Sequence, residues 1–184
     1  MVSGLPRSGT SMMMKMLSEG GLEAVTDAIR AADEDNPNGY FEFEPVKKLA
    51  EGQDTWLKDA GGKLVKVISA LLEQLPAEYP YRVIFMRRKM DEILASQKQM
   101  LVRSNKPTDT VSDEKLAEMY VRHLAKVDAW LKAQPNVAVL YVDYNAMLTS
   151  PQEHAEKVND FLDEQLAVEK MVGVIDPSLY RQRK

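Results

Sequence analysis

Residues 3–12 read SGLPRSGTSM, and this stretch decides which fold we expect. Gly4 and Gly9 have the spacing of the two glycines in the phosphate-binding loop G-x-x-x-x-G-K-[ST]. The lysine position of that loop holds Thr10 instead, and a cation stands earlier in the loop, at Arg7. The stretch therefore predicts a strand that turns into a helix and grips an anion without the usual lysine.

The backbone of this loop would make most of the contacts with the anion. The N–H groups of Ser8, Gly9, Thr10 and Ser11 would point at one spot, where the helix dipole also favours negative charge. Arg7 adds a planar, permanently charged fork that suits phosphate or sulfate oxygens. The alternative is a tight strand–helix turn without a ligand, but the full string P-R-S-G-T-S is more specific than the glycine spacing alone.

Composition limits the class of protein. The 184 residues suit one α/β domain, which we expect to span residues 1–184, and the net charge of −4 without a basic arm argues against broad nucleic-acid binding. The chain has no cysteine and only two histidines, so we expect no metal site. We find no signal peptide and no apolar run that could span a bilayer, and we expect a cytoplasmic protein.

Apolar runs alternate with helical patterns along the chain. The strands are predicted at residues 1–3, 64–68, 82–86 and 137–142, and the apolar runs at 82–86 and 137–142 predict buried strands. The helices are predicted at residues 10–19, 91–103, 113–132 and from 151 onward, the last opened by a capping box at Ser150. This order predicts an α/β fold of three layers, with a mostly parallel central sheet between helices and a P-loop-like topology.

Two details of these elements can be checked against a structure. Only residues 1–3 precede the glycine loop, so either the chain starts inside its first strand or upstream residues are missing. The helix at 113–132 is expected to bury an apolar stripe made of Leu116, Met119, Tyr120, Leu124, Val127, Trp130 and Leu131.

The string GLPRSGTS resembles the 5′-phosphosulfate loop of the sulfotransferases that use 3′-phosphoadenosine 5′-phosphosulfate (PAPS), where P-[KR]-S-G-[TS]-[ST] replaces the kinase loop. The resemblance is closest to bacterial members. It implies PAPS as the donor and no magnesium, because the donor has no polyphosphate chain. It also implies that Arg7 contacts the leaving phosphate and the bridging oxygen.

A second stretch supports the resemblance. The family follows a later strand with R-x-P-x-D-x-x-x-S, whose arginine and serine hold the 3′-phosphate of the donor. Here FMRRKMDEILAS places Arg88 and Ser96 at the matching separation, although Met90 replaces the proline and Glu92 the aspartate. Arg87 is a rival for the arginine, but then the serine falls one position late.

Two further stretches are similar to the family. Residues 139–162, VLYVDYNAMLTSPQEHAEKVNDFL, resemble its strand, tyrosine-containing turn and final helix, which is a signature of the fold rather than of the chemistry. Residues 36–42 follow the pattern N-P-x-G-Y-F-E of the bacterial members.

Sulfuryl transfer also needs a base for the acceptor. Many cytosolic members use a histidine soon after a lysine on the strand that here reads KLVKVISALL, which has no histidine. Members that act on carbohydrate or peptide hydroxyls use a glutamate, and here Glu42 matches the N-P-x-G-Y-F-E pattern residue for residue. Glu42 is therefore our candidate base, while Glu44, Lys66 and His123 stay open as alternatives.

The sequence predicts a sulfotransferase that moves a sulfuryl group to a hydroxyl or amine of a small-molecule or carbohydrate acceptor. Residues 105–112 could gate the acceptor, and Tyr180 and Arg181 could close over the nucleotide. One rival is a P-loop kinase or nucleotide hydrolase that binds magnesium through Asp143 and Ser11. The other rival is a non-catalytic nucleotide-binding protein that keeps the grip but lacks a base.

Overall fold

A computed structural model describes residues 1–27, 39–108 and 110–176. Its sheet contains three strands, β1 (Val2–Gly4), β2 (Tyr81–Arg87) and β3 (Val137–Asp143), in the order β1-β2-β3 with both pairs parallel. The α-helices are α1 (Thr10–Glu19), α2 (Glu44–Lys47), α3 (Met90–Arg103), α4 (Asp113–Ala133), α5 (Tyr144–Thr149), α6 (Pro151–Leu162) and α7 (Val168–Gly173). Three short 3₁₀ helices complete the described elements: η1 (Leu49–Glu51), η2 (Thr55–Asp59) and η3 (Ser69–Gln74).

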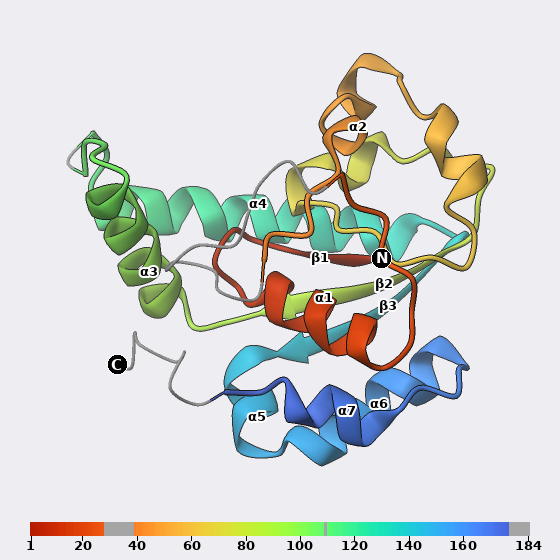
Figure 1. The fold of residues 1–184 in the computed structure, drawn as a ribbon. Helices are drawn as coiled ribbons and strands as arrows, with labels where there is room; N and C mark the ends of the chain where they lie inside the picture. Colours follow the sequence, from red (N-terminus) through yellow and green to blue (C-terminus); the bar gives the residue numbers. More distant parts are fainter. Residues whose placement is uncertain (28–38, 109, 177–184) are drawn as a thin grey trace.

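Helices cover both faces of the sheet, as Figure 1 shows: α1, α5, α6 and α7 lie on one side and α4 on the other. The predicted α/β architecture with a parallel sheet between helices is therefore confirmed. Strand β2 explains the layering, because its side chains alternate between the faces. Ile84 and Met86 belong to one core cluster, and Val83 and Phe85 belong to the other.

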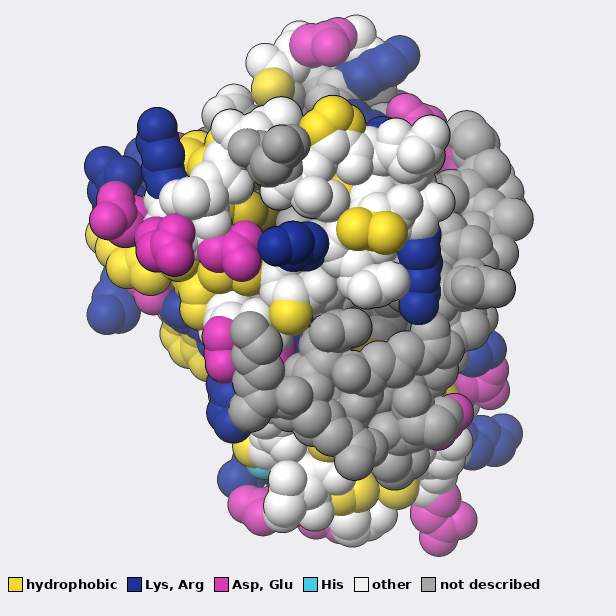
Figure 2. Space-filling model, turned by 90° about the vertical axis from the view of Figure 1, so that its left-hand side faces the viewer, with side chains coloured by type: hydrophobic (Ala, Val, Ile, Leu, Met, Phe, Trp, Pro, Cys, Tyr) yellow, Lys and Arg dark blue, Asp and Glu magenta, His cyan; other side chains and the backbone are white. Residues whose placement is uncertain are grey.

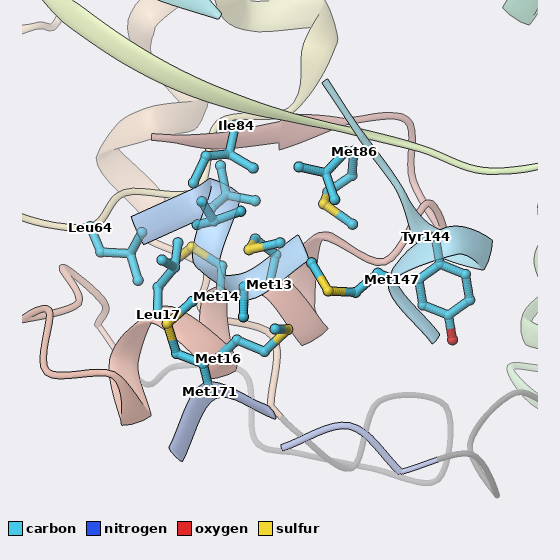
Figure 3. Close-up of a cluster of buried hydrophobic side chains, with 14 residues drawn as sticks. Met13, Met14, Met16, Leu17, Leu64, Ile84, Met86, Tyr144, Met147 and Met171 are labelled. Atoms are coloured by element: carbon cyan, nitrogen blue, oxygen red, sulfur yellow. The ribbon is translucent and has the colours of Figure 1, made fainter. Parts of the chain in front are cut away.

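The core under α1 is rich in methionine. Figure 3 shows these side chains packed together between α1, the sheet and the C-terminal helices. The fully buried methionines of this cluster are Met13, Met14, Met16, Met86, Met147 and Met171. Unbranched thioether side chains fill irregular gaps well, so they suit the space between α1, the sheet and the C-terminal helices.

The predicted strand at residues 64–68 is only partly formed. Lys66 pairs with Val2 through a single parallel bridge, with backbone bonds from Val2 N to Val65 O (2.9 Å) and from Val67 N to Val2 O (3.0 Å). The prediction of a full strand was wrong because β1 offers only three residues to pair with. The segment nevertheless runs alongside β1, which is an edge strand in the order β1-β2-β3.

Three other details of the sequence prediction needed correction. Strand β3 is not buried throughout, since it lies at one end of the strand order and Tyr141 is 42 % exposed. Met119 faces solvent at 50 % exposure and leaves the apolar stripe of α4. Helix α6 starts at Pro151 as predicted, but among the described residues the Ser150 side chain forms no capping bond; Glu153 pairs with Lys157 instead.

Candidate functional site

The loop between β1 and α1 adopts a strained, tightly wound backbone. Gly4, Arg7 and Gly9 all have positive φ, at 149°, 68° and 97°. Arg7 is the unusual member, because a side chain disfavours this region. Inside the loop, the N–H and the hydroxyl of Ser8 both donate to the carbonyl of Leu5, at 3.2 and 2.7 Å. Ser8 therefore stabilises the turn itself.

Both glycines are needed for space as well as for conformation. A Cβ on Gly4 would lie 2.6 Å from Ser8 Oγ and 2.8 Å from Met86 O. A Cβ on Gly9 would lie 2.4 Å from Cδ2 of the Tyr144 ring. The loop is thus folded closely against the ends of β2 and β3, and the spacing quoted in the sequence has a steric cause.

The loop delivers the chain into the first turn of α1, which begins at Thr10 with Gly9 as its N-cap. The first N–H groups of a helix have no acceptor within the helix, and Gly9 has no side chain that could cap them. Together with the partial positive charge of the helix end, the N–H groups that follow Ser8 suit an anion.

Two sequence motifs meet at this loop. Arg7 Nε donates to Ser96 Oγ at 2.9 Å, which brings the loop cation to helix α3. Arg88, the residue after β2, donates from one terminal nitrogen to the carbonyl of Arg7 at 3.1 Å. The predicted site residues Arg7, Arg88 and Ser96 are therefore neighbours in space, although nearly half the chain separates them.

Arg88 is held on three sides. Its Nε donates to Glu92 Oε2 at 2.9 Å, and its guanidinium lies over the Tyr144 ring, 4.5 Å from the centroid. Glu92 is completely buried, and Asn145 Nδ2 donates to both of its carboxylate oxygens at 2.9 and 3.1 Å. The motif after β2, the loop after β1 and the turn after β3 thus form one polar unit.

Arg87 points to the other face of the sheet. It forms an ion pair with Asp128 of α4 and lies over the rings of Phe85 and Tyr141, at 5.1 and 5.0 Å from their centroids. The two adjacent arginines therefore belong to different environments, and Arg88 is the one that contacts the loop.

Lys66 brings a second cation to the loop. Its Nζ donates to Ser11 Oγ at 2.9 Å and to the carbonyl of Tyr40 at 2.8 Å. The single bridge to Val2 places Lys66 alongside β1, and the bond to Ser11 places its side chain on the α1 side of the sheet. The contact with Tyr40 links the loop to the segment that carries the candidate base.

Glu42 and Glu44 both form ion pairs with Lys47. Glu42 Oε2 is 3.3 Å from Lys47 Nζ, and the Glu42 side chain is 27 % exposed. Backbone contacts fix the segment: Asp27 N donates to Glu42 O, and Glu44 N donates to the Asp27 carboxylate. Residues 36–38 of the N-P-x-G-Y-F-E pattern lie outside the described residues.

The remaining candidates take other positions. His123 Nε2 and Ser69 Oγ form a hydrogen bond of 2.8 Å between α4 and η3. Asp143 caps α5 by accepting from Ala146 N at 2.8 Å. Of the proposed gate, residues 105–108 and 110–112 connect α3 to α4, whereas residue 109, Tyr180 and Arg181 lie outside the described residues.

Burial and charge act together on the side chains around the loop. Burial raises the pKa of Tyr144, while the neighbouring Arg88 and Arg7 partly oppose that rise. The hydrogen bond with Glu44 raises the pKa of Lys47; burial opposes this rise, and the hydrogen bond with Glu42 adds to it. Tyr144 therefore stays a neutral phenol against the loop, and Lys47 stays charged between its carboxylates.

Figure 2 views the molecule from the end at which α3 projects. On the described part of this face, lysine and arginine side chains stand singly among polar and hydrophobic ones rather than forming one broad basic surface. Among residues 1–27, 39–108 and 110–176, no group of three acidic, histidine or cysteine side chains is arranged to hold a metal ion. Nor does any helix there have the length and apolar character needed to cross a membrane.

Sequence reasoning missed the contribution of three residues. Tyr144 and Asn145 were assigned only to the fold, yet they contact the loop and Glu92. Glu92 was noted only as a replacement for the aspartate of the motif. Its position four residues after Arg88, in the first turn of the helix, indicates an ion pair and could have revealed it. No local pattern indicates that β3 ends beside Gly9.

Comparison with known protein families agrees with this geometry. The sulfotransferase family model matches residues 65–167, which is more than half of the chain. The match includes Lys66, the Arg88 and Ser96 stretch and the turn at Tyr144, while the glycine loop precedes it. No curated protein matches the chain. The family match and the site geometry lead to one conclusion: this chain belongs to the sulfotransferase family and is a transferase.

Proposed function

We propose that this sulfotransferase takes its sulfuryl group from PAPS and transfers it to a hydroxyl or amine of a small-molecule or carbohydrate acceptor. The observation that carries the proposal is the meeting of two anion-binding elements. The glycine loop with Arg7 lies in direct hydrogen-bond contact with Ser96 and Arg88. A donor with a 5′-phosphosulfate and a separate 3′-phosphate needs two such elements close together.

The first turn of α1 would hold the 5′-phosphosulfate. The backbone N–H groups of Gly9, Thr10 and Ser11, with the positive end of the helix, fit a compact anion, and the glycines leave no Cβ in its way. Ser8 uses its N–H within the turn, so its contribution is to shape the loop. Arg7 would neutralise charge on the leaving phosphate as the sulfur–oxygen bond breaks.

Arg88 and Ser96 would hold the 3′-phosphate. Arg88 supplies a charged fork at the end of β2, and Ser96 supplies a hydroxyl from the second turn of α3. A free 3′-phosphate distinguishes the donor from ATP, so these residues would set donor specificity. Lys66 would add positive charge beside Ser11, where oxygens of the transferred group would lie.

Glu42 would act as the general base. In the transfer, the acceptor oxygen or nitrogen forms a bond to sulfur, the bond from sulfur to the bridging oxygen breaks, and adenosine 3′,5′-bisphosphate leaves. Glu42 would take the acceptor proton. Its segment is tied to the loop through the Tyr40–Lys66–Ser11 contacts, which supports this role. Its ion pair with Lys47 must loosen for the carboxylate to accept a proton.

Calorimetric binding of adenosine 3′,5′-bisphosphate and of ATP, each with and without magnesium, tests the proposal. We expect the bisphosphate to bind more tightly than ATP and without any need for magnesium. Preference for ATP with magnesium would replace the proposal with the kinase hypothesis. In the kinase hypothesis Asp143 binds magnesium, and to do so it would have to give up the hydrogen bond that it accepts from Ala146 N at the start of α5. Binding of the bisphosphate without turnover of any acceptor would favour a non-catalytic binding protein.

A further inference from the structure

Two adjacent arginines at the end of β2 are each paired with a carboxylate, but the two pairs differ in burial. Arg87 pairs with Asp128, and both side chains are about one-third exposed, at 30 % and 28 %. Arg88 pairs with Glu92, and the exposed fractions of these side chains are 8 % and 0 %. The Arg88–Glu92 pair is therefore buried beside the loop, whereas the Arg87–Asp128 pair is partly exposed. The second pair serves as a control for substitutions in the first.

The buried carboxylate of Glu92 is satisfied on both oxygens. Arg88 Nε and Asn145 Nδ2 donate to Oε2 at 2.9 and 3.1 Å, and Asn145 Nδ2 also donates to Oε1 at 2.9 Å. A buried charge is tolerated only when it is paired and hydrogen-bonded, so Glu92 has little freedom to change its position. The residues that orient it come from the turn after β3.

Glu92 in turn fixes Arg88. With its Nε on Glu92, the guanidinium lies flat over the Tyr144 ring and donates to the carbonyl of Arg7. An arginine side chain loses considerable rotamer entropy when it is ordered, and a partner that orders it beforehand removes that cost from ligand binding. Arg7 has a positive φ, which a side chain disfavours, so the hydrogen bond from Arg88 to its carbonyl also stabilises the loop.

We propose that Glu92 is a positioning residue for the donor site and that Asn145 holds it in place. The proposal rests on the function proposed above, in which Arg88 contacts the 3′-phosphate. Its consequence is specific: Glu92 and Asn145 set the preference for a 3′,5′-bisphosphate over a 5′-monophosphate, because only the bisphosphate reaches Arg88. A residue that merely supports the fold would change the affinity for both ligands equally.

The experiment measures the dissociation constants of adenosine 3′,5′-bisphosphate and adenosine 5′-monophosphate by calorimetry for four proteins. They are the unmodified chain, Glu92→Gln, Asn145→Ala and the control Asp128→Asn. Glu92→Gln keeps the shape but removes the charge, whereas Asn145→Ala keeps both charges of the pair and removes the amide that donates to Glu92. Near-ultraviolet circular dichroism and chemical unfolding check that each variant is folded.

We expect Glu92→Gln to lower the bisphosphate preference about tenfold and Asn145→Ala to lower it by a smaller factor, since a hydrogen bond to a charged group is being weakened. Asp128→Asn should leave the preference unchanged. If Glu92→Gln does not fold, the double variant Arg88→Met, Glu92→Gln removes both buried charges together. Asn145→Ala then provides the test alone. The double variant serves as the reference, because its preference for the bisphosphate is measured without the Arg88 guanidinium.

An unchanged or increased preference in folded Glu92→Gln and Asn145→Ala would overturn the proposal. So would a loss of preference in Asp128→Asn alone, which would assign the 3′-phosphate to Arg87. These outcomes differ from failure of the proposed function, in which the unmodified chain itself would show no preference for the bisphosphate.

Discussion

Arg7 Nε donates a hydrogen bond of 2.9 Å to Ser96 Oγ, and the two residues are 89 positions apart in the chain. The contact joins the loop after β1 to the helix after β2. Parallel strands make this possible, because their carboxyl ends lie at one edge of the sheet and the segments that follow them become neighbours. Arg7 and Ser96 can therefore act on one ligand, each from a different motif.

Ser96→Ala should weaken the binding of adenosine 3′,5′-bisphosphate about tenfold, because it removes a hydroxyl that contacts both Arg7 and, by our proposal, the 3′-phosphate. Calorimetry measures the change. Ser104→Ala, at the exposed C-cap of the same helix, is the matched control and should leave binding unchanged. Equal affinity in Ser96→Ala and the unmodified chain would remove Ser96 from the donor site.

Gly9→Ala should destabilise the protein by about 1–3 kcal/mol, because alanine disfavours the positive φ of 97° at this position and its methyl group would lie 2.4 Å from a ring atom of Tyr144. Urea unfolding measures the change in the free energy of unfolding. Gly61→Ala is the control, since a Cβ there meets no heavy atom within 4 Å and should have little effect. A stable Gly9→Ala variant would mean that the Tyr144 ring can move away from the loop.

Much of the fold follows from local pattern. The helix predicted at residues 10–19 is observed as Thr10–Glu19, and the predicted strand at 82–86 is observed as Tyr81–Arg87. Both segments combine strong periodicity with clear boundaries. Residues 64–68 also have an apolar pattern, but whether they form a strand depends on how long their partner β1 is, and no local signal carries that information.

The candidate site was predictable in part, for the same reason. The glycine spacing and the separation between Arg88 and Ser96 are local motifs, and the structure brings them together. The contacts of Tyr144 with Gly9 and of Asn145 with Glu92 depend on where β3 lies in the sheet. Similarly, Lys66 meets Ser11 only because its segment runs beside β1.

Met13→Ala should lower the free energy of unfolding by about 2–5 kcal/mol, because it leaves a cavity in the core under α1. Met13 is fully buried in the methionine cluster of Figure 3. Met119→Ala, at 50 % exposure on α4, is the control and should change stability by less than about 0.5 kcal/mol. Equal effects of the two substitutions would show that the cluster is loosely packed.

Stability should fall between about pH 10 and pH 12, in part because of Tyr81. Burial raises the pKa of Tyr81 to about 12, and its hydroxyl donates to Pro76 O at 2.9 Å. An unfolded tyrosine ionises near pH 10, so above that pH the unfolded chain releases a proton that the folded chain retains. The contribution of Tyr81 is therefore complete below pH 10 and is lost as the pH rises through 12.

Tyr81→Phe isolates this effect, because other tyrosines also ionise at high pH. At pH 8 the variant should be less stable by about 1 kcal/mol, since Pro76 O loses its donor. Between pH 10 and 12 its stability should decline less steeply than that of the unmodified chain. Chemical unfolding across this range provides both curves. Parallel curves would show that Tyr81 ionises in the folded state as easily as in the unfolded one.

Glu42→Gln should lower kcat for sulfuryl transfer by about 10²–10⁴-fold, because the acceptor proton loses its base, while the affinity for adenosine 3′,5′-bisphosphate stays the same. Kinetics with any acceptor that the unmodified chain sulfates, together with calorimetry, measure the two quantities. Glu44→Gln is the matched control, since Glu44 shares Lys47 with Glu42 but begins helix α2. If kcat instead collapses in His123→Asn and survives in Glu42→Gln, the base is the histidine that contacts Ser69 at the end of the Lys66 segment.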